Sequence, residues 1–348
     1  MKNLKIFTNN IEKEAVNQIN ALLEQDAFKD SKIRIMPDVH AGKGCVIGFT
    51  GDLGDKAIPN IVGVDIGCGM LCVELGKVDI DLETLDRVIR EYVPSGRNVH
   101  NEFTDIVPNH KHYLYEIHIP NLKCYKKLKN KDKWLEKSLG TLGGGNHFIE
   151  VDEDDDGNKY LVIHTGSRNL GKQVAEVYQE KAIKYCSYDK EMKQEKENVI
   201  REYKVSGREK EIQNKLIEIS KKYEDKTKLP KDLCYLEGDL REDYLHDMKI
   251  CQEFAKLNRI SIARIIIINI FNYGNVVPFA EYSISNNEEI FKGLIGLGNV
   301  DGLKADMYGG HLDFSENYNC FETIHNYISF EDNIVRKGAI SAKKEKEC

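Results

Sequence analysis

The stretch Pro59-Asn60-Ile61-Val62-Gly63-Val64-Asp65-Ile66-Gly67-Cys68-Gly69-Met70 places a carboxylate and a thiol three residues apart in a glycine-rich bend. The apolar residues from Ile61 to Val64 predict a buried strand, and Gly67 would let the backbone turn sharply after it. Asp supplies a hard oxygen ligand, and Cys supplies a soft sulfur that can bridge two metal ions. The stretch is therefore a candidate metal site. Taken alone, a half-buried Cys beside a capping Asp is the commoner explanation.

Two histidines further along the chain favour the metal site. His147 follows a loop of glycines and begins an alternating strand, whereas His164 ends an apolar strand and precedes a polar turn. Such positions are held by a sheet and yet open to a cleft, where metal ligands are useful. His325 is a third candidate, and with Asp65 and Cys68 it would complete a mixed ligand set.

Composition and charge narrow the class of protein. The 348 residues carry a net charge of −7, so RNA binding through bulk positive charge is not expected, although a local cationic track and bound divalent ions could still hold phosphates. Nine Cys without a Cys-x-x-Cys pair, and no signal peptide, predict a reduced, cytoplasmic protein. The apolar run 265–271 is too short to span a bilayer, so no membrane segment is expected.

The pattern of apolar residues predicts an α+β fold. It indicates an amphipathic helix over 11–25, strands between 33 and 75, a helix over 82–93 and a long helix over 239–267. Residues 173–231 predict a charged helical hairpin that turns near Ser206-Gly207, as an insertion into one domain of residues 1–348. The candidate ligands run from residue 65 to 325, which favours one integrated mixed α/β core. The lysines of 122–137 are either a phosphate-tracking surface or an ordinary solvated helix face.

Five blocks of sequence, in order along the chain, resemble the RtcB-type RNA ligases, the GTP- and manganese-dependent enzymes of tRNA splicing and RNA repair. The blocks are Met36-Pro37-Asp38-Val39-His40-Ala41-Gly42-Lys43-Gly44, Val62-Gly63-Val64-Asp65-Ile66-Gly67-Cys68-Gly69-Met70, Gly143-Gly144-Gly145-Asn146-His147-Phe148-Ile149-Glu150, His164-Thr165-Gly166-Ser167-Arg168, and His325-Asn326-Tyr327-Ile328 followed by Arg336-Lys337-Gly338-Ala339.

The resemblance implies an RtcB-type core and an RNA ligase activity. Such an enzyme joins an RNA 3′-phosphate or 2′,3′-cyclic phosphate end to a 5′-hydroxyl end, after GMP activates the phosphate. The implied cofactors are GTP and two Mn²⁺ ions. The implied partners are RNA with these ends and an activating protein.

The resemblance also implies roles for particular residues. Cys68 would bridge the two Mn²⁺ ions, one of which would also bind His164 and His325, and the other Asp65 and His147. Arg168 would hold an RNA phosphate by a bidentate fork. The implied nucleotide-binding residues are Asn146, His147, Phe148, Ile149, Glu150, His325 and Asn326.

The guanylylated histidine of the family lies in a Ser-x-x-His-Gly-Ala-Gly block after the last matching segment. No His-Gly-Ala-Gly occurs in these 348 residues, so no catalytic residue is assigned. The alternative expectation is a catalytically incomplete, metal-dependent RNA-end-binding protein or a truncated relic.

Overall fold

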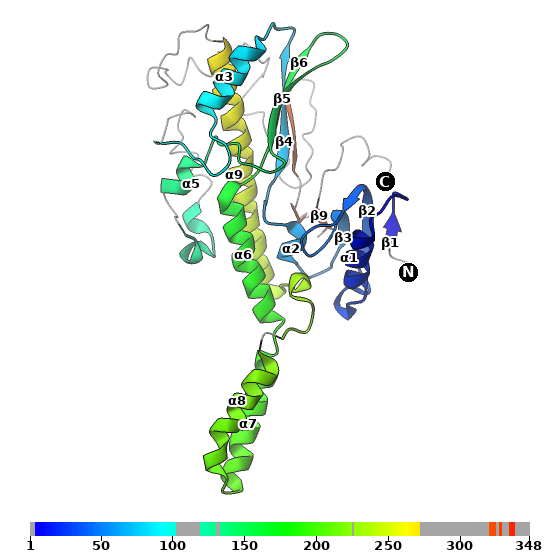
Figure 1. Ribbon diagram of the computed structural model, residues 1–348, viewed down its shortest axis with the longest axis vertical. Coiled ribbons are helices and arrows are strands. Elements are labelled where there is room, and N and C mark those ends of the chain that lie inside the picture. The colour runs from blue at the N-terminus through cyan, green and yellow to red at the C-terminus, as the bar shows by residue number, and fades with distance from the viewer. Residues whose placement is uncertain are drawn as a thin grey trace.

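The computed structural model describes residues 4–101, 119–129, 133–224, 226–271, 320–324, 327–328 and 334–337. In this part of the chain the elements form an α+β fold with two β-sheets, which confirms the predicted class (Figure 1). None of its helices is long and apolar enough to cross a membrane.

One sheet contains the strands nearest the candidate site. Its order is β5 (Phe148–Glu153), β6 (Lys159–Thr165), β4 (Gly69–Gly76) and β7 (Cys320–Ile324), and every neighbouring pair is antiparallel. Gly69 pairs with Thr165 on one side and with Ile324 on the other, and Phe148 pairs with His164. One terminus of each of the four strands therefore lies at the same end of this sheet.

The second sheet lies beside the first helix. Its order is β1 (Leu4–Ile6), β2 (Lys32–His40), β3 (Ile47–Asp52), β9 (Ile334–Lys337) and β8 (Tyr327–Ile328). Helix α1 (Lys13–Leu23), predicted as amphipathic, buries Ala15, Ile19 and Leu22 in the core that this sheet shares.

A long helix connects the two halves of the molecule. Helix α9 (Gly238–Phe271) contributes Tyr244 and Phe254 to the core beside the second sheet, and Ile262 and Ile266 to a smaller core under β4 and β6. Helices α3 (Leu82–Tyr92) and α6 (Arg168–Tyr185) pack against it, as Figure 1 shows. The predicted helices over 82–93 and 239–267 are confirmed. Shorter elements are η1 (Asp26–Phe28), η2 (Ile119–Asn121), η3 (Tyr125–Lys127), α5 (Lys133–Lys137), η4 (Glu209–Glu211) and η5 (Lys231–Leu233).

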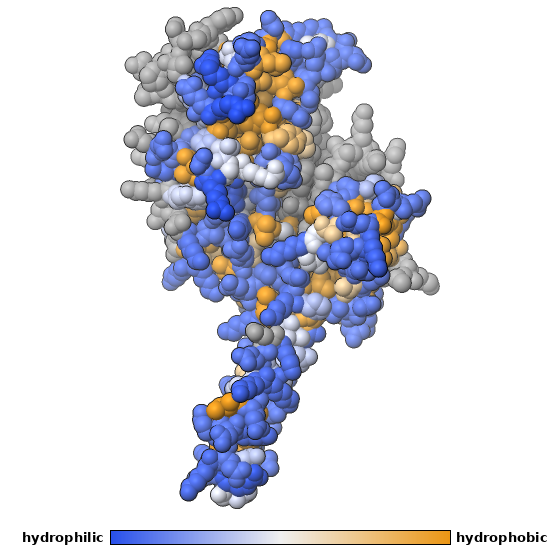
Figure 2. Space-filling view, in the orientation of Figure 1, coloured by the Kyte–Doolittle hydropathy of each residue, from blue (hydrophilic) through white to orange (hydrophobic). Residues whose placement is uncertain are grey.

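The charged hairpin extends away from this body. Helices α7 (Asp189–Val205) and α8 (Ile212–Tyr223) turn at Ser206-Gly207, where the sequence predicted a turn (Figure 1). Figure 2 shows a surface of mostly polar residues along it. Within the two helices only Ile219 is buried. The preceding α6 differs, because five of its apolar side chains and Gly171 are buried.

The prediction of a strand over residues 61–64 is wrong. Residues Pro59–Val62 form a short helix, α2, whose Ile61 and Val62 are buried, whereas Val64 is 39% exposed. Pro59 stands in the first turn, where its fixed φ angle favours a helix. Gly63 then ends the helix with a φ of 97°. The site residues thus follow a buried helical turn rather than a strand.

Candidate metal centre

The bend from Asp65 to Cys68 packs directly against α9. Gly67 has a φ of 74°, and a Cβ atom on it would lie 2.9 Å from the Cα of Gln252 and 3.1 Å from the Cβ of Ala255. The Cys68 amide donates to the Asp65 carbonyl over 3.1 Å, which closes the turn. Glycine at 67 therefore lets the bend approach the helix and aim both side chains at one point.

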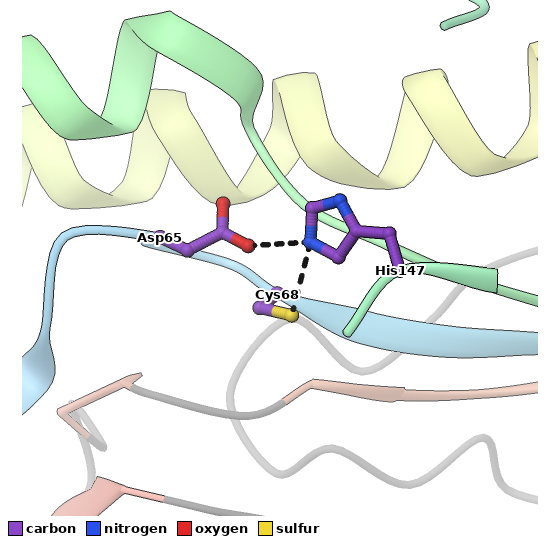
Figure 3. Close-up of side chains that lie close together, drawn as sticks. All are labelled: Asp65, Cys68 and His147. Carbon is purple, nitrogen blue, oxygen red and sulfur yellow. Dashed lines mark hydrogen bonds and ion pairs between the residues drawn. The ribbon is translucent and has the colours of Figure 1, made fainter. Parts of the chain in front are cut away.

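Three side chains converge at this point, from the bend before β4 and the loop before β5 (Figure 3). Ligand atoms of Asp65, Cys68 and His147 all lie within 4.8 Å of one another. The His147 Nε2 is 2.8 Å from Asp65 Oδ2 and 3.8 Å from Cys68 Sγ. The side chain of His147 is 7% exposed and that of Asp65 is 28% exposed, so the imidazole is nearly buried whereas the carboxylate is partly exposed to solvent.

The hydrogen bonds of His147 suit a bound cation. Its Nδ1 is 2.9 Å from the Leu142 carbonyl, which can only accept, so this nitrogen carries the proton. In a neutral ring the lone pair of Nε2 then faces the carboxylate oxygen of Asp65. Two acceptors 2.8 Å apart need either a further proton, on the ring or on the carboxyl group, or a cation that both of them bind. The donor set of oxygen, sulfur and nitrogen fits a transition-metal ion.

His164 contacts Cys68 and the ring of His147, whose centroid is 5.6 Å from its own. Its Nε2 is 3.1 Å from the Cys68 Sγ, and its ring packs edge-on against the Phe148 ring with centroids 5.3 Å apart. Burial, and then the neighbouring His147, lower the pKa of His164. A neutral imidazole is the form that binds a metal.

The Cys68 thiol is held in its neutral form by its surroundings. Burial, followed by the charge and hydrogen bond of Asp65, raises the pKa of Cys68 far above the usual range. A metal ion bound at the thiol would reverse this balance, because coordination deprotonates a thiol.

Arg168 stands at the start of α6 in a left-handed backbone conformation, with a φ of 57°. Its Nε donates to Thr141 Oγ1 over 2.8 Å and its Nη2 to the Gly96 carbonyl over 2.9 Å. A Cβ on Gly143 would lie 2.0 Å from the Arg168 Nη1, so the guanidinium packs on the glycine loop. Left-handed backbone at a non-glycine residue costs free energy and is found preferentially at functional sites.

The other predicted nucleotide-binding residues are spread over the start of β5. Asn146 and Glu150 are exposed, and the backbone carbonyl of Asn146 accepts a hydrogen bond from the His164 ring. Ile149 is half-buried against the smaller core. His325 and Asn326 lie outside the described residues.

The two aromatic side chains of the lysine-rich stretch pack inward. Tyr125 and Trp134 are half-buried and pack against the main core. The exposed lysines of its described part are Lys123, Lys126, Lys127 and Lys129. Exposed lysines suit both a phosphate-tracking surface and an ordinary solvated face, so both interpretations of this stretch stay predictions.

Two residues that the sequence analysis did not single out contact the segments that carry the ligands. Asn258 and Arg259 of α9 are both fully buried. Their one signal in the sequence is a polar pair between the apolar residues Leu257 and Ile260. The fold and the site together define an α+β protein with a candidate carboxylate, thiol and imidazole metal centre.

Comparisons with known proteins identify the family. Residues 26–275 match the family model of the tRNA-splicing ligase RtcB. The RNA-splicing ligase RtcB of Escherichia coli (strain K12) is 30% identical over 250 residues, which cover 65% of this chain and 50% of that protein. The tRNA-splicing ligase RtcB of Methanococcus maripaludis is 32% identical over 186 residues, which cover 41% of this chain and 39% of that protein. The chain belongs to the RtcB family of RNA-splicing ligases, and it spans about half the length, or less, of the curated relatives it matches.

Proposed function

We propose that this chain carries the metal centre of an RNA ligase that joins 3′-phosphate or 2′,3′-cyclic phosphate ends to 5′-hydroxyl ends, in tRNA splicing or RNA repair. The observation that carries the proposal is the convergence of Asp65, Cys68 and His147 on one point, with His147 Nε2 facing the Asp65 carboxylate 2.8 Å away. Membership of the RtcB family supports the reaction class.

The proposed ligands bind two Mn²⁺ ions. Cys68 would serve both ions, His164 and His325 would hold one of them, and Asp65 and His147 would hold the other. His325 comes from the resemblance to the family, and the described strand β7 ends at Ile324, which pairs with Gly69. Two such ions supply charge neutralisation at phosphate oxygens and orient the attacking group. The donor set alone would bind Zn²⁺ more tightly, so metal supply decides which ion is present.

The substrate chemistry gives the remaining residues their proposed roles. The 3′-phosphate is a poor electrophile, so the GMP of GTP is attached to it with release of pyrophosphate. GMP then leaves when the 5′-hydroxyl oxygen loses its proton and forms the new phosphodiester bond. Positioning and charge neutralisation are the main needs of such transfers. Arg168 holds the RNA phosphate. The guanylate is held by the start of β5, through Asn146, His147, Phe148, Ile149 and Glu150, together with His325 and Asn326.

The test uses two RNA pieces, one with a 3′-phosphate and one with a 5′-hydroxyl, incubated with the protein, GTP and Mn²⁺. A joined product that EDTA abolishes is the expected result, and intact-mass spectrometry of the protein records any GMP adduct. Tight binding of the phosphorylated piece, without joining and without an adduct, would overturn the ligase proposal in favour of an RNA-end-binding protein.

A further inference from the structure

Helix α9 presents two adjacent polar residues, Asn258 and Arg259, to the segments that carry the candidate ligands. Both are fully buried in a helix whose other buried residues at this level are mostly apolar. Burying a guanidinium costs free energy unless it is hydrogen-bonded, so a hydrophobic residue would serve packing alone better. The position of this pair therefore calls for a role beyond filling space.

Arg259 ties together the backbones beside two ligands. Its Nη1 donates to the Gly67 carbonyl and to the Thr165 carbonyl, each over 2.9 Å. Gly67 precedes Cys68, and Thr165 follows His164. One guanidinium nitrogen thus fixes the bend of Cys68 relative to the strand end of His164. The Cys68 Sγ and the His164 Nε2 lie 3.1 Å apart.

Asn258 holds the loop that positions His147. Its Oδ1 accepts from the amides of Gly140 and Thr141 over 2.7 and 3.1 Å. Its Nδ2 donates to the Thr141 carbonyl over 3.0 Å and to the Gly166 carbonyl over 3.3 Å. The next residue of that loop, Leu142, supplies the carbonyl bound to the His147 ring.

We propose that Asn258 and Arg259 are positioning residues of the metal centre, which hold the bend of Cys68, the loop of His147 and the strand end of His164 at coordination distance. This inference rests on the proposed function, because it assumes that the centre binds metal. Removal of a side chain that orients metal ligands through hydrogen bonds typically lowers metal affinity by about 10- to 100-fold.

The same helix offers a matched control. Asp247 lies eleven residues, about three turns, before Asn258 and is also fully buried. It accepts from two successive amides, those of Lys123 and Cys124, over 2.7 and 2.9 Å. Neither residue adjoins a candidate ligand in the sequence. Asp247→Ala therefore removes the same kind of hydrogen-bonded anchor away from the metal centre.

The experiment compares metal affinity with fold stability in the full chain. Mn²⁺ binding is measured by calorimetry, Cd²⁺ binding by the charge-transfer absorbance of its thiolate bond, and folding by thermal unfolding of the metal-free protein. Asn258→Ala and Arg259→Met are expected to lower the affinity for both metals by about tenfold or more. Arg259→Lys, which keeps a charged donor, is expected to recover part of the loss. Asp247→Ala should lower the unfolding temperature and keep both affinities within about twofold of wild type.

The outcomes separate the two proposals. If the wild type binds neither metal, the proposed metal centre fails and this inference fails with it. If the wild type binds metal and the folded Asn258→Ala and Arg259→Met proteins bind it equally well, only the positioning role is overturned. An affinity loss in Asp247→Ala as large as in Asn258→Ala would also overturn it, because the effect would then follow general stability.

Discussion

The Nε2 of His147 lies 2.8 Å from the Asp65 carboxylate, while the Nδ1 of the same ring is 2.9 Å from the Leu142 carbonyl. The ring is thus placed between two acceptors. The contact with Asp65 then needs either a further proton, on the ring or on the carboxyl group, or a cation that both side chains bind. This relationship allows the metal hypothesis to be separated from a simple buried ion pair.

Replacing Asp65 by Asn tests that separation. An amide can donate to Nε2 of the neutral ring, so the metal-free Asp65→Asn protein should unfold at the same temperature as the wild type or higher. Its Mn²⁺ affinity should fall by about tenfold or more, because a charged ligand is lost. Calorimetry and thermal unfolding in EDTA measure the two effects. Unchanged affinity, together with a large loss of stability, would indicate a structural ion pair.

The glycine loop provides a second test. Gly143 and Gly145 both have left-handed backbones, with φ angles of 90° and 77°, so an Ala at either position is strained. A Cβ on Gly143 would also lie 2.0 Å from Arg168 Nη1 and 2.7 Å from His147 Nδ1, whereas a Cβ on Gly145 would meet nothing within 4 Å.

We therefore expect Gly143→Ala to weaken metal binding by about tenfold or more and Gly145→Ala to cost stability alone, of the order of 1 kcal/mol. Metal titration and denaturant unfolding of both variants give the comparison. Equal metal affinities in the two variants would show that the packing of Arg168 and His147 on this loop does not shape the centre.

The sequence predicted the strand ends at His147 and His164 better than the segment before Asp65. The alternating residues of β5 and the apolar run of β6 are long enough to show their period, and His147 and His164 stand at their ends as predicted. The apolar residues 61–64 are too few to separate a strand from a helical turn. Pro59 was the signal that favoured the helix. Ile61 and Val62 are apolar because they are buried, and this made the helical turn resemble a buried strand.

Buried histidines predict a pH dependence of stability. Burial lowers the pKa of His100, whose Nε2 is 3.2 Å from the Gly140 carbonyl, and also that of His164. In the unfolded chain a histidine has its ordinary pKa of about 6.5, so the unfolded state binds more protons below that pH. The stabilisation is therefore complete above about pH 6.5 and is lost as the pH falls through the lowered values.

The metal-free protein should accordingly melt at a lower temperature at about pH 5 than at about pH 7. His100→Gln keeps a donor for the Gly140 carbonyl and cannot titrate, so its melting temperature should fall less steeply with pH. Thermal unfolding in EDTA over this pH range measures both slopes. If the melting temperatures of the wild type and His100→Gln fall equally steeply with pH, the proposed contribution of His100 to the pH dependence is wrong.

The hairpin of α7 and α8 should be dispensable for the metal centre. Within these helices only Ile219 is buried, and the chain on either side is joined by a bridge between Ser187 and Thr227. Replacement of residues 189–224 by a short Gly/Ser linker should leave Mn²⁺ affinity within about twofold of wild type. Calorimetry of the shortened protein measures this. A tenfold loss would show that the hairpin supports the site.

The contacts of α9 with the site could not have been predicted from one sequence. Arg259 binds the carbonyl of Gly67, which lies 192 residues earlier in the chain. Nothing local records such a pairing, and the polar pair at 258–259 merely interrupts the apolar pattern of the helix. The backbone strain at Arg168 was likewise invisible, because it depends on the packing of its side chain against Thr141 and Gly96.

The most direct test of the metal centre is calorimetric Mn²⁺ titration of three proteins, the wild type, Cys68→Ala and Cys72→Ala. Both cysteines are buried, and Cys72 lies inside β4, four residues after Cys68. We predict that Cys68→Ala abolishes Mn²⁺ binding and that Cys72→Ala barely changes it. Equal affinity of the wild type and Cys68→Ala would contradict the bridging role of Cys68 and, with it, the proposed centre.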